Sequence, residues 1–375
     1  MEYTQQIENL MSLASNPDQA VKKTLAATGK KAIGCFPIYT PEEIIYAAGG
    51  IPIGMWGGKT ELSGADRYLQ AFCCSIMRSN IEYGVKGSYN MLEAVIIPTF
   101  CDTLKCVCEN WKVAVPQVPV LPIVYPQHRL IEAGYHYLIE ELDRMKGEIE
   151  KVLKVNITEE MLEEAFQIYE EYRKTMREFV DFVSENPSVL EAKARHLVLK
   201  ASWFMDKKEY TGIIRNILEQ WKEMPVEEYK GIKVVATGLI SEPVEILDVF
   251  QRNGIAIVAD DLAQESRQFR VVARKEGSVL ERLAGRMVDQ RGCTFIYEEE
   301  KTRGQMLINM VKENHADAVI VFMMKFCDPE EFDYPIYKKE LEDAGIPFLY
   351  LEIDQQLDSF AQIETRIQSF TEMLQ

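Results

Sequence analysis

Short apolar runs alternate with longer segments of helical period along most of the chain. The short runs are rich in Val, Ile and Ala, and the segments between them repeat apolar residues every three or four positions. The runs lie at 31–37, 51–56, 94–98, 117–124, 234–238, 255–259, 318–324 and 348–353. Short buried strands that alternate with helices are typical of a parallel sheet, so the pattern predicts an α/β fold.

Two segments lack the strand pattern. Residues 1–30 have only spaced apolar positions, and residues 128–222 are long, charged and periodic, with a helix start at Thr158. We therefore predict two Rossmann-like parallel-sheet lobes joined by a helical segment. The predicted boundaries are an N-terminal α/β domain with a helical arm (1–150), a helical linker (151–230) and a C-terminal α/β domain (231–375).

Three cysteines stand where a strand run or loop gives way to a helix. Each precedes a residue that commonly caps a helix: Cys74 before Ser75, Cys101 before Asp102 and Cys327 before Asp328. Ligands of open α/β sheets bind at the carboxyl ends of the strands. Helix N-termini there carry partial positive charge, which suits a thiolate or an anionic iron–sulfur cluster. The pattern indicates a shared cluster site in the cleft between the lobes.

A further helix start is predicted after the first strand run. Thr40 with Pro41, Glu42 and Glu43 has the composition of a capping box, and Cys35 lies at the end of the preceding run.

The remaining cysteines favour other roles. Cys101, Cys106 and Cys108 form C-x4-C-x-C, which misses the plant-type ferredoxin spacing by one residue. A helix from Asp102 would turn Cys106 and Cys108 away from Cys101, so we predict that they are not ligands. Cys293 is expected to be a core or turn thiol, since free cysteine is among the most buried residues. Zinc held by three thiolates and one other group fits Cys74, Cys101 and Cys327 equally well.

Charge and composition limit the kinds of binding partner and the compartment that we expect. The chain has 42 basic and 59 acidic residues, a net charge of −17, which argues against nucleic acid and anionic membranes. The start of the sequence lacks the features of a signal peptide, and no apolar run reaches the ~18 residues of a membrane span. We therefore expect a cytoplasmic protein, in which eight cysteines suit metal or redox chemistry better than disulfides. No phosphate-binding loop or nucleophile elbow occurs.

The segment 259–270 leaves a predicted strand and concentrates charge. It contains Asp260, Asp261, Arg267 and Arg270. We predict a solvated helix start with local ion pairs, each of little energetic value. The alternative is a segment that supports the site or docks a partner.

Several of these segments together resemble the cluster-binding segments of 2-hydroxyacyl-CoA dehydratases. The matching segments are 34–37, 72–77, 98–103, 260–265, 324–330 and 352–356. The resemblance covers nearly the whole chain and is strongest to the beta subunits of the 2-hydroxyisocaproyl-CoA and phenyllactyl-CoA enzymes. It implies one 4Fe–4S cluster per chain, held by Cys74, Cys101 and Cys327 with a non-cysteine ligand on the fourth iron. Cys73, beside the expected ligand, departs from the pattern.

The resemblance also implies the chemistry. These oxygen-sensitive hydro-lyases of amino-acid fermentation convert an (R)-2-hydroxyacyl-CoA to the 2-enoyl-CoA. One added electron makes a ketyl radical anion that expels the hydroxyl and acidifies the β-hydrogen, and the electron is then returned. The implied partners are a homologous alpha subunit with its own 4Fe–4S cluster, which holds most of the acyl-CoA, and an ATP-dependent iron–sulfur activator.

Two other functions stay open at this point. One is an ATP-dependent reductase of the benzoyl-CoA reductase or double-cubane-cluster type, which shares the fold. The other is a non-catalytic scaffold stabilised by zinc. Which acyl group is used cannot be read from the residues.

Overall fold

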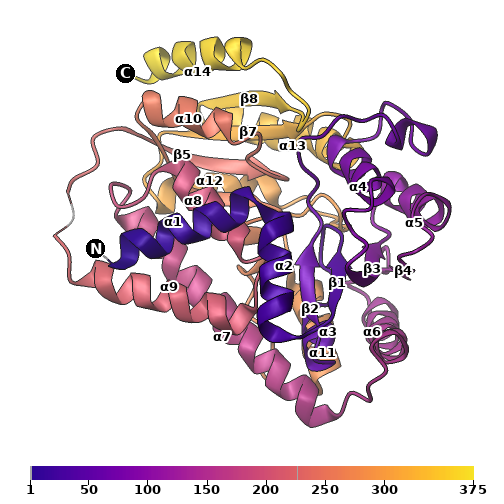
Figure 1. The fold of residues 1–375 in the computed structure, drawn as a ribbon. Helices are drawn as coiled ribbons and strands as arrows, with labels where there is room; N and C mark the ends of the chain where they lie inside the picture. The colour runs from indigo at the N-terminus through magenta and orange to yellow at the C-terminus, as the bar shows by residue number, and fades with distance from the viewer. Residues whose placement is uncertain (1, 226) are drawn as a thin grey trace.

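The computed structural model describes residues 2–225 and 227–375 and contains two parallel four-stranded sheets (Figure 1). The strands of the first are β1 (Ala32–Cys35), β2 (Ile51–Gly54), β3 (Leu92–Pro98) and β4 (Val120–Ile123). Those of the second are β5 (Ile232–Gly238), β6 (Ile255–Leu262), β7 (Ala318–Met324) and β8 (Phe348–Ile353). The orders β2-β1-β3-β4 and β6-β5-β7-β8 follow the same rule, so the second sheet repeats the topology of the first. The predicted α/β fold with two parallel sheets is confirmed.

Helices cover both faces of each sheet. They are α1 (Glu2–Ser15), α2 (Pro17–Thr28), α3 (Glu42–Ala47), α4 (Ser75–Val85), α5 (Asp102–Ala114), α6 (Glu132–Leu153), α7 (Glu159–Glu185), α8 (Ala192–Ala201), α9 (Lys207–Lys222), α10 (Glu245–Arg252), α11 (Val279–Asp289), α12 (Arg303–Glu313), α13 (Asp328–Asp343) and α14 (Ala361–Leu374). Two short 3-10 helices, Ala65–Arg67 and Ser266–Gln268, complete the elements.

Strand β7 explains the short apolar runs. All seven of its residues are buried, because helices pack on both of its faces. Val319 and Val321 point to the core beneath α12 and α13, whereas Ile320 and Phe322 point to the core beneath α10 and α14 (Figure 1). A strand buried on both sides cannot alternate apolar and polar residues, and it therefore appears as one continuous apolar run.

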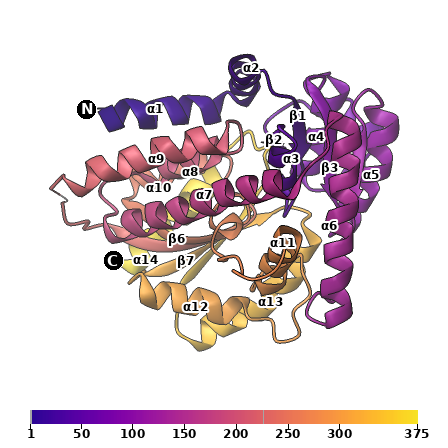
Figure 2. The same cartoon turned by 90° about the horizontal axis from the view of Figure 1, so that it is seen from below.

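The helical middle of the chain packs against the arm at the N-terminus. The apolar face of α7, including Tyr172, Met176 and Phe179, is buried with Leu10 of α1 and Trp221 of α9. Figure 2 shows α9 between α1 and α7, and α9 contacts both of these helices. The domain boundaries predicted near residues 150 and 230 stay a prediction.

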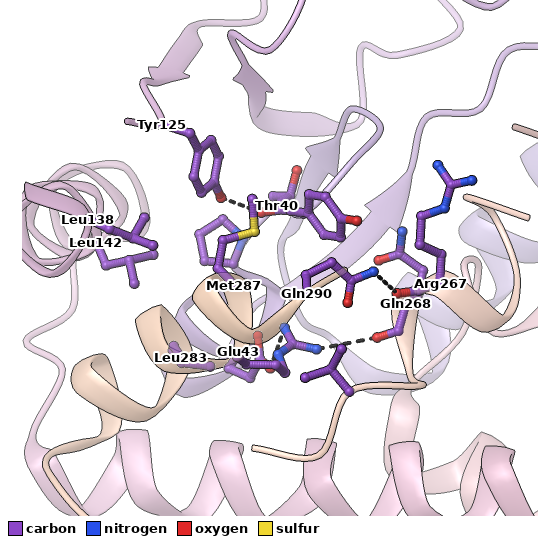
Figure 3. Close-up of a pocket in the computed structure, with 14 residues that line it drawn as sticks. Thr40, Glu43, Tyr125, Leu138, Leu142, Arg267, Gln268, Leu283, Met287 and Gln290 are labelled. Carbon is purple, nitrogen blue, oxygen red and sulfur yellow. Dashed lines mark hydrogen bonds and ion pairs between the residues drawn. The ribbon is translucent and has the colours of Figure 1, made fainter. Parts of the chain in front are cut away.

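Helix α11 joins the two halves of the chain. It follows β6 in sequence but packs against α6 and α7, which precede the second sheet (Figure 2). Leu283 and Met287 of α11 face Leu138 and Leu142 of α6 across a small cavity of about 40 Å³ (Figure 3). The buried Arg129 side chain donates to the Met287 carbonyl at 3.1 Å. Leu283 and Met287 therefore join the core that α6 forms with the first sheet, although α11 follows β6 of the second sheet.

One predicted helix start is wrong. Helix α3 begins at Glu42 with Pro41 in the N-cap position, and the Thr40 hydroxyl donates to the Phe36 carbonyl at 2.9 Å. Thr40 therefore closes the loop after β1 instead of capping α3.

The long helix α7 begins with a side-chain cap that can be tested. Thr158 accepts a hydrogen bond from the Met161 N–H at 3.3 Å. We expect Thr158→Ala to lower the free energy of unfolding by about 1 kcal/mol, because the first-turn N–H loses its partner. Urea denaturation should detect the change. Thr365→Ala is the control, because Thr365 is exposed and its hydroxyl bonds only the Ala361 carbonyl of its own helix; an equal loss in both variants would contradict a capping role.

Within residues 2–225 and 227–375, no helix combines the length and the apolar character needed to cross a membrane.

Candidate functional site

The carboxyl ends of both sheets open onto one cavity of about 350 Å³. Residues that follow six different strands line it: Pro37 after β1, Trp56 after β2, Cys101 after β3, Leu239 after β5, Ala263 after β6 and Cys327 after β7. Strand ends are the usual ligand site of open α/β sheets. Here two such sheets face the same space, so a bound group would touch both halves of the chain.

Three thiols line this cavity. Cys74 and Cys101 come from the first half of the chain, and Cys327 comes from the second. Each is the residue directly before a helix, since α4 begins at Ser75, α5 at Asp102 and α13 at Asp328. The structure therefore brings together the three cysteines that the sequence singled out.

The expected caps of these helices need correction. The cysteines themselves occupy the N-cap positions, whereas Ser75, Asp102 and Asp328 are the first helical residues. The Cys101 sulfur takes over the capping role, because it accepts the Leu104 N–H at 3.4 Å. A sulfur in this position lies at the positive end of the helix, where negative charge is stabilised.

Burial keeps the free thiols protonated. It raises the pKa of Cys74 to about 12, although N–H groups of the first turn of α4 oppose the rise. The pKa of Cys101 is raised and that of Cys327 is raised well above its usual value, in both cases chiefly by burial. Repulsion from Cys101 adds to the rise in the pKa of Cys74, and repulsion from Cys74 and Cys101 adds to the rise in the pKa of Cys327. A metal that binds here must displace these protons.

The donor set fits an iron–sulfur cluster. Three thiol sulfurs, three helix N-termini and an apolar lining that includes Trp56, Met77 and Phe100 surround a single space. Thiolates are the usual cluster ligands, and positive helix ends offset the cluster's negative charge. Within the described residues, no three His, Cys, Asp or Glu side chains lie close enough to hold one metal ion. The assignment of Cys74, Cys101 and Cys327 as ligands therefore stays a prediction.

The other cysteines lie outside the lining of this cavity. Cys106 is exposed on α5, and Cys108 is buried with its sulfur 3.8 Å from the Ile97 carbonyl. Cys73 is buried beside Gln70. Cys293 is buried against the Arg267 guanidinium.

The prediction of a solvated helix start at 259–270 is wrong. Asp260, Asp261 and Arg267 are all buried, because β6 continues through Asp261 and the segment then turns inward. Asp261 binds Arg267 at 2.9 Å and Arg303 of α12 at 3.0 Å. These pairs form a buried network, not isolated surface pairs.

This network reaches the helix that follows Cys327. Arg303 and Arg267 also face the Glu330 carboxylate of α13, at 2.8 Å and 3.5 Å. Glu330 lies in the first helical turn, three residues after Cys327. The segment therefore supports the wall of the cavity, as the alternative interpretation of 259–270 anticipated.

Some lining residues gave no signal in the sequence. Phe295 reaches the cavity from the loop after α11, and Phe332 reaches it from within α13, so neither directly follows a strand run. Ala263 could have been found, because it follows β6 just as the cysteines follow strands or precede helices. Phe332 is strongly exposed and stands at the rim of the cavity.

Comparisons with known proteins agree with this geometry. A family profile described as 2-hydroxyglutaryl-CoA dehydratase, D-component, matches residues 37–374. The chain is 46% identical to the beta subunit of lactoyl-CoA dehydratase of Anaerotignum propionicum over 371 residues, 98% of each chain. It is 41% identical to the (R)-phenyllactyl-CoA dehydratase beta subunit of Clostridium sporogenes over 362 residues, 96% of each chain. It is 23% identical to a benzoyl-CoA reductase subunit of Thauera aromatica over 355 residues, 93% of this chain and 92% of that one.

Proposed function

Since the chain belongs to the 2-hydroxyglutaryl-CoA dehydratase D-component family, we propose that it is the beta subunit of a 2-hydroxyacyl-CoA dehydratase. The enzyme is a hydro-lyase that converts a 2-hydroxyacyl-CoA to the 2-enoyl-CoA and acts with a partner subunit. The likeness to two beta subunits over nearly their whole length supports this function over a benzoyl-CoA-type reductase.

The observation that carries the proposal is the convergence of three thiols, each at the N-cap position of a helix, on one cavity. Cys74, Cys101 and Cys327 would hold a 4Fe–4S cluster, one per chain, between the two sheets. When bound, such a cluster supplies a low-potential electron-transfer centre. The fourth iron would take a ligand other than cysteine.

The chain's own residues would prepare the site in three ways. The thiols give up their protons to bind the metal, because burial otherwise keeps them protonated. N–H groups at the starts of α4, α5 and α13 stabilise the resulting negative charge. Trp56, Met77 and Phe100 give the cavity an apolar wall, which would limit the number of water molecules in contact with a bound cluster.

We further propose that this chain relays electrons and does not itself hold the reacting thioester. Its partner is a homologous alpha subunit with its own cluster and most of the acyl-CoA contacts, and an ATP-dependent iron–sulfur activator supplies the first electron. All eight cysteines are free in the structure, which suits the reducing cytoplasm.

The test is anaerobic purification of the chain with and without its partner subunit. We expect iron and sulfide in equal amounts, an electron paramagnetic resonance signal after reduction, and dehydration of a 2-hydroxyacyl-CoA only in the presence of partner and activator. Full dehydration by this chain alone would refute the electron-relay role.

The same preparation separates the competing functions. Direct reduction of the substrate, or more than one cluster's iron per chain, would favour the reductase. Colourless protein with stoichiometric zinc would favour the zinc-stabilised scaffold.

A further inference from the structure

Gln355 is a buried glutamine at the junction of the two halves. It lies two residues beyond the end of β8 and is 2% exposed. Its side-chain Nε2 donates to the Trp56 carbonyl at 2.9 Å and to the Glu242 carboxylate at 3.1 Å, and its Oε1 accepts from the Ser79 hydroxyl at 3.2 Å. One side chain therefore bonds the loop after β2, helix α4 and the loop after β5.

The backbone of Gln355 extends these contacts to the thiols. Its N–H donates to the Ser75 hydroxyl at 3.1 Å, and Ser75 is the residue directly after Cys74. The same hydroxyl lies 3.3 Å from the Met324 sulfur at the end of β7. The Met324 carbonyl in turn accepts the Cys327 N–H at 3.1 Å. A short chain of contacts thus links Cys74 of the first half to Cys327 of the second.

The neighbouring Gln356 also forms hydrogen bonds across the junction of the two halves. Its Nε2 donates to the Gly58 carbonyl at 3.0 Å, and its Oε1 accepts the Thr60 N–H at 2.9 Å. The packing is tight, since a Cβ on Gly57 would lie 2.6 Å from Gln355 Oε1. Gly57 also has a φ of 71°, so a side chain there would be strained for two reasons.

We infer that Gln355 is a positioning residue, which fixes the start of α4, and hence Cys74, relative to Cys327 across the junction of the two halves. The inference rests on the proposed function, because it concerns the cluster that these thiols would hold. Gln355 itself is outside the lining of the cavity and would act through α4, which its side chain contacts at Ser79 and its backbone N–H contacts at Ser75. Supporting residues of this kind typically change metal affinity by about 10–100-fold when they are removed.

The test is Gln355→Met, which keeps the length of the side chain, removes its hydrogen bonds to Trp56, Ser79 and Glu242, and leaves the backbone N–H bonded to Ser75. In the dimer with the partner subunit, we expect a chelator to remove iron from this chain about tenfold faster than from the parent. We also expect a shifted paramagnetic resonance spectrum and reduction potential, with an unchanged far-ultraviolet circular dichroism spectrum. A purely structural glutamine would lower the melting temperature but leave the spectrum and potential of the bound cluster in place.

The control is Gln305→Met. Gln305 is an exposed glutamine of α12 that bonds only Asn309, so parent-like iron loss is expected. Iron loss, spectrum and potential that match the parent in Gln355→Met would overturn the inference. If that variant does not fold, Ser75→Ala replaces it, because it breaks the links to Gln355 and Met324 together; parent-like values there would overturn the inference equally. A parent chain without iron would instead refute the proposed function, so the two failures are distinguishable.

Discussion

Cys327→Ala is expected to abolish dehydration and to remove most of the iron from this chain. Its sulfur is the contribution of the second half of the chain to a cavity that Cys74 and Cys101 approach from the first half. Loss of a direct ligand should exceed the effect of outer residues, so we expect iron affinity to fall by more than about 100-fold. Iron and sulfide analysis of the anaerobic dimer measures this directly. Cys74→Ala and Cys101→Ala should behave alike.

Cys106→Ala is the matched control for this result. Cys106 lies on α5, five residues after Cys101, but it is exposed and outside the cavity lining. Its iron content and turnover should equal those of the parent. Cys108→Ala should also keep its iron, since its buried sulfur contacts the Ile97 carbonyl and not the cavity. Retained iron in Cys327→Ala, or lost iron in Cys106→Ala, would reject the ligand assignment.

The sheets could be predicted because their central strands are buried on both faces. The run at 318–324 coincides with β7, since no polar residue is tolerated between α10 and α14 on one face and α12 and α13 on the other. The position of the thiols followed from the same logic. A cysteine that lies between a strand and a helix falls at the carboxyl edge of a parallel sheet, whichever sheet it belongs to.

The helix caps were predicted wrongly because the residues most often found at N-cap positions have a side-chain oxygen as acceptor. Ser75, Asp102 and Asp328 have the common capping side chains, yet each is the first helical residue and the cysteine before it takes the cap. A sequence pattern scores each position by its average behaviour. It cannot register that a cysteine takes the N-cap position instead.

The prediction that the charges of segment 259–270 are exposed also failed. The reason is that residues far away in the sequence bury these charges. Asp261 and Arg267 look like a surface pair because they are six residues apart in a charged segment. Their environment is set by Arg303, 42 residues after Asp261, and by Glu330 of α13, which no local pattern connects to them. Gln355 was missed as a junction residue for the same reason, since its partners Trp56 and Ser79 lie 299 and 276 residues away.

Asp261→Asn is expected to destabilise the fold by about 3–5 kcal/mol, because it removes one of the two carboxylates that face the buried Arg267 and Arg303 guanidiniums and leaves Glu330 alone to balance two charges. The carboxylate is fully buried and binds Arg267 and Arg303 at 2.9 and 3.0 Å and also the Arg270 guanidinium. Asparagine keeps the shape but removes the negative charge and turns an N–H₂ group toward the arginines. Urea denaturation at pH 7 should show the loss. Asp289→Asn, which breaks an exposed pair with Arg274, should cost no more than about 1 kcal/mol.

The loss of stability in Asp261→Asn, measured against the parent, is expected to depend on pH. Burial alone would raise the pKa of Asp261, but the guanidiniums of Arg267, Arg270 and Arg303 hold it well below its usual range. A carboxyl whose pKa is lower in the folded state contributes stability above its unfolded pKa of about 3.9, and that contribution is lost as pH falls toward the folded value. The difference in unfolding free energy between parent and Asp261→Asn should therefore be constant from neutral pH to about pH 5 and shrink below about pH 4. A difference that stayed constant on acidification would mean that the Asp261 carboxylate is not held ionised by these arginines.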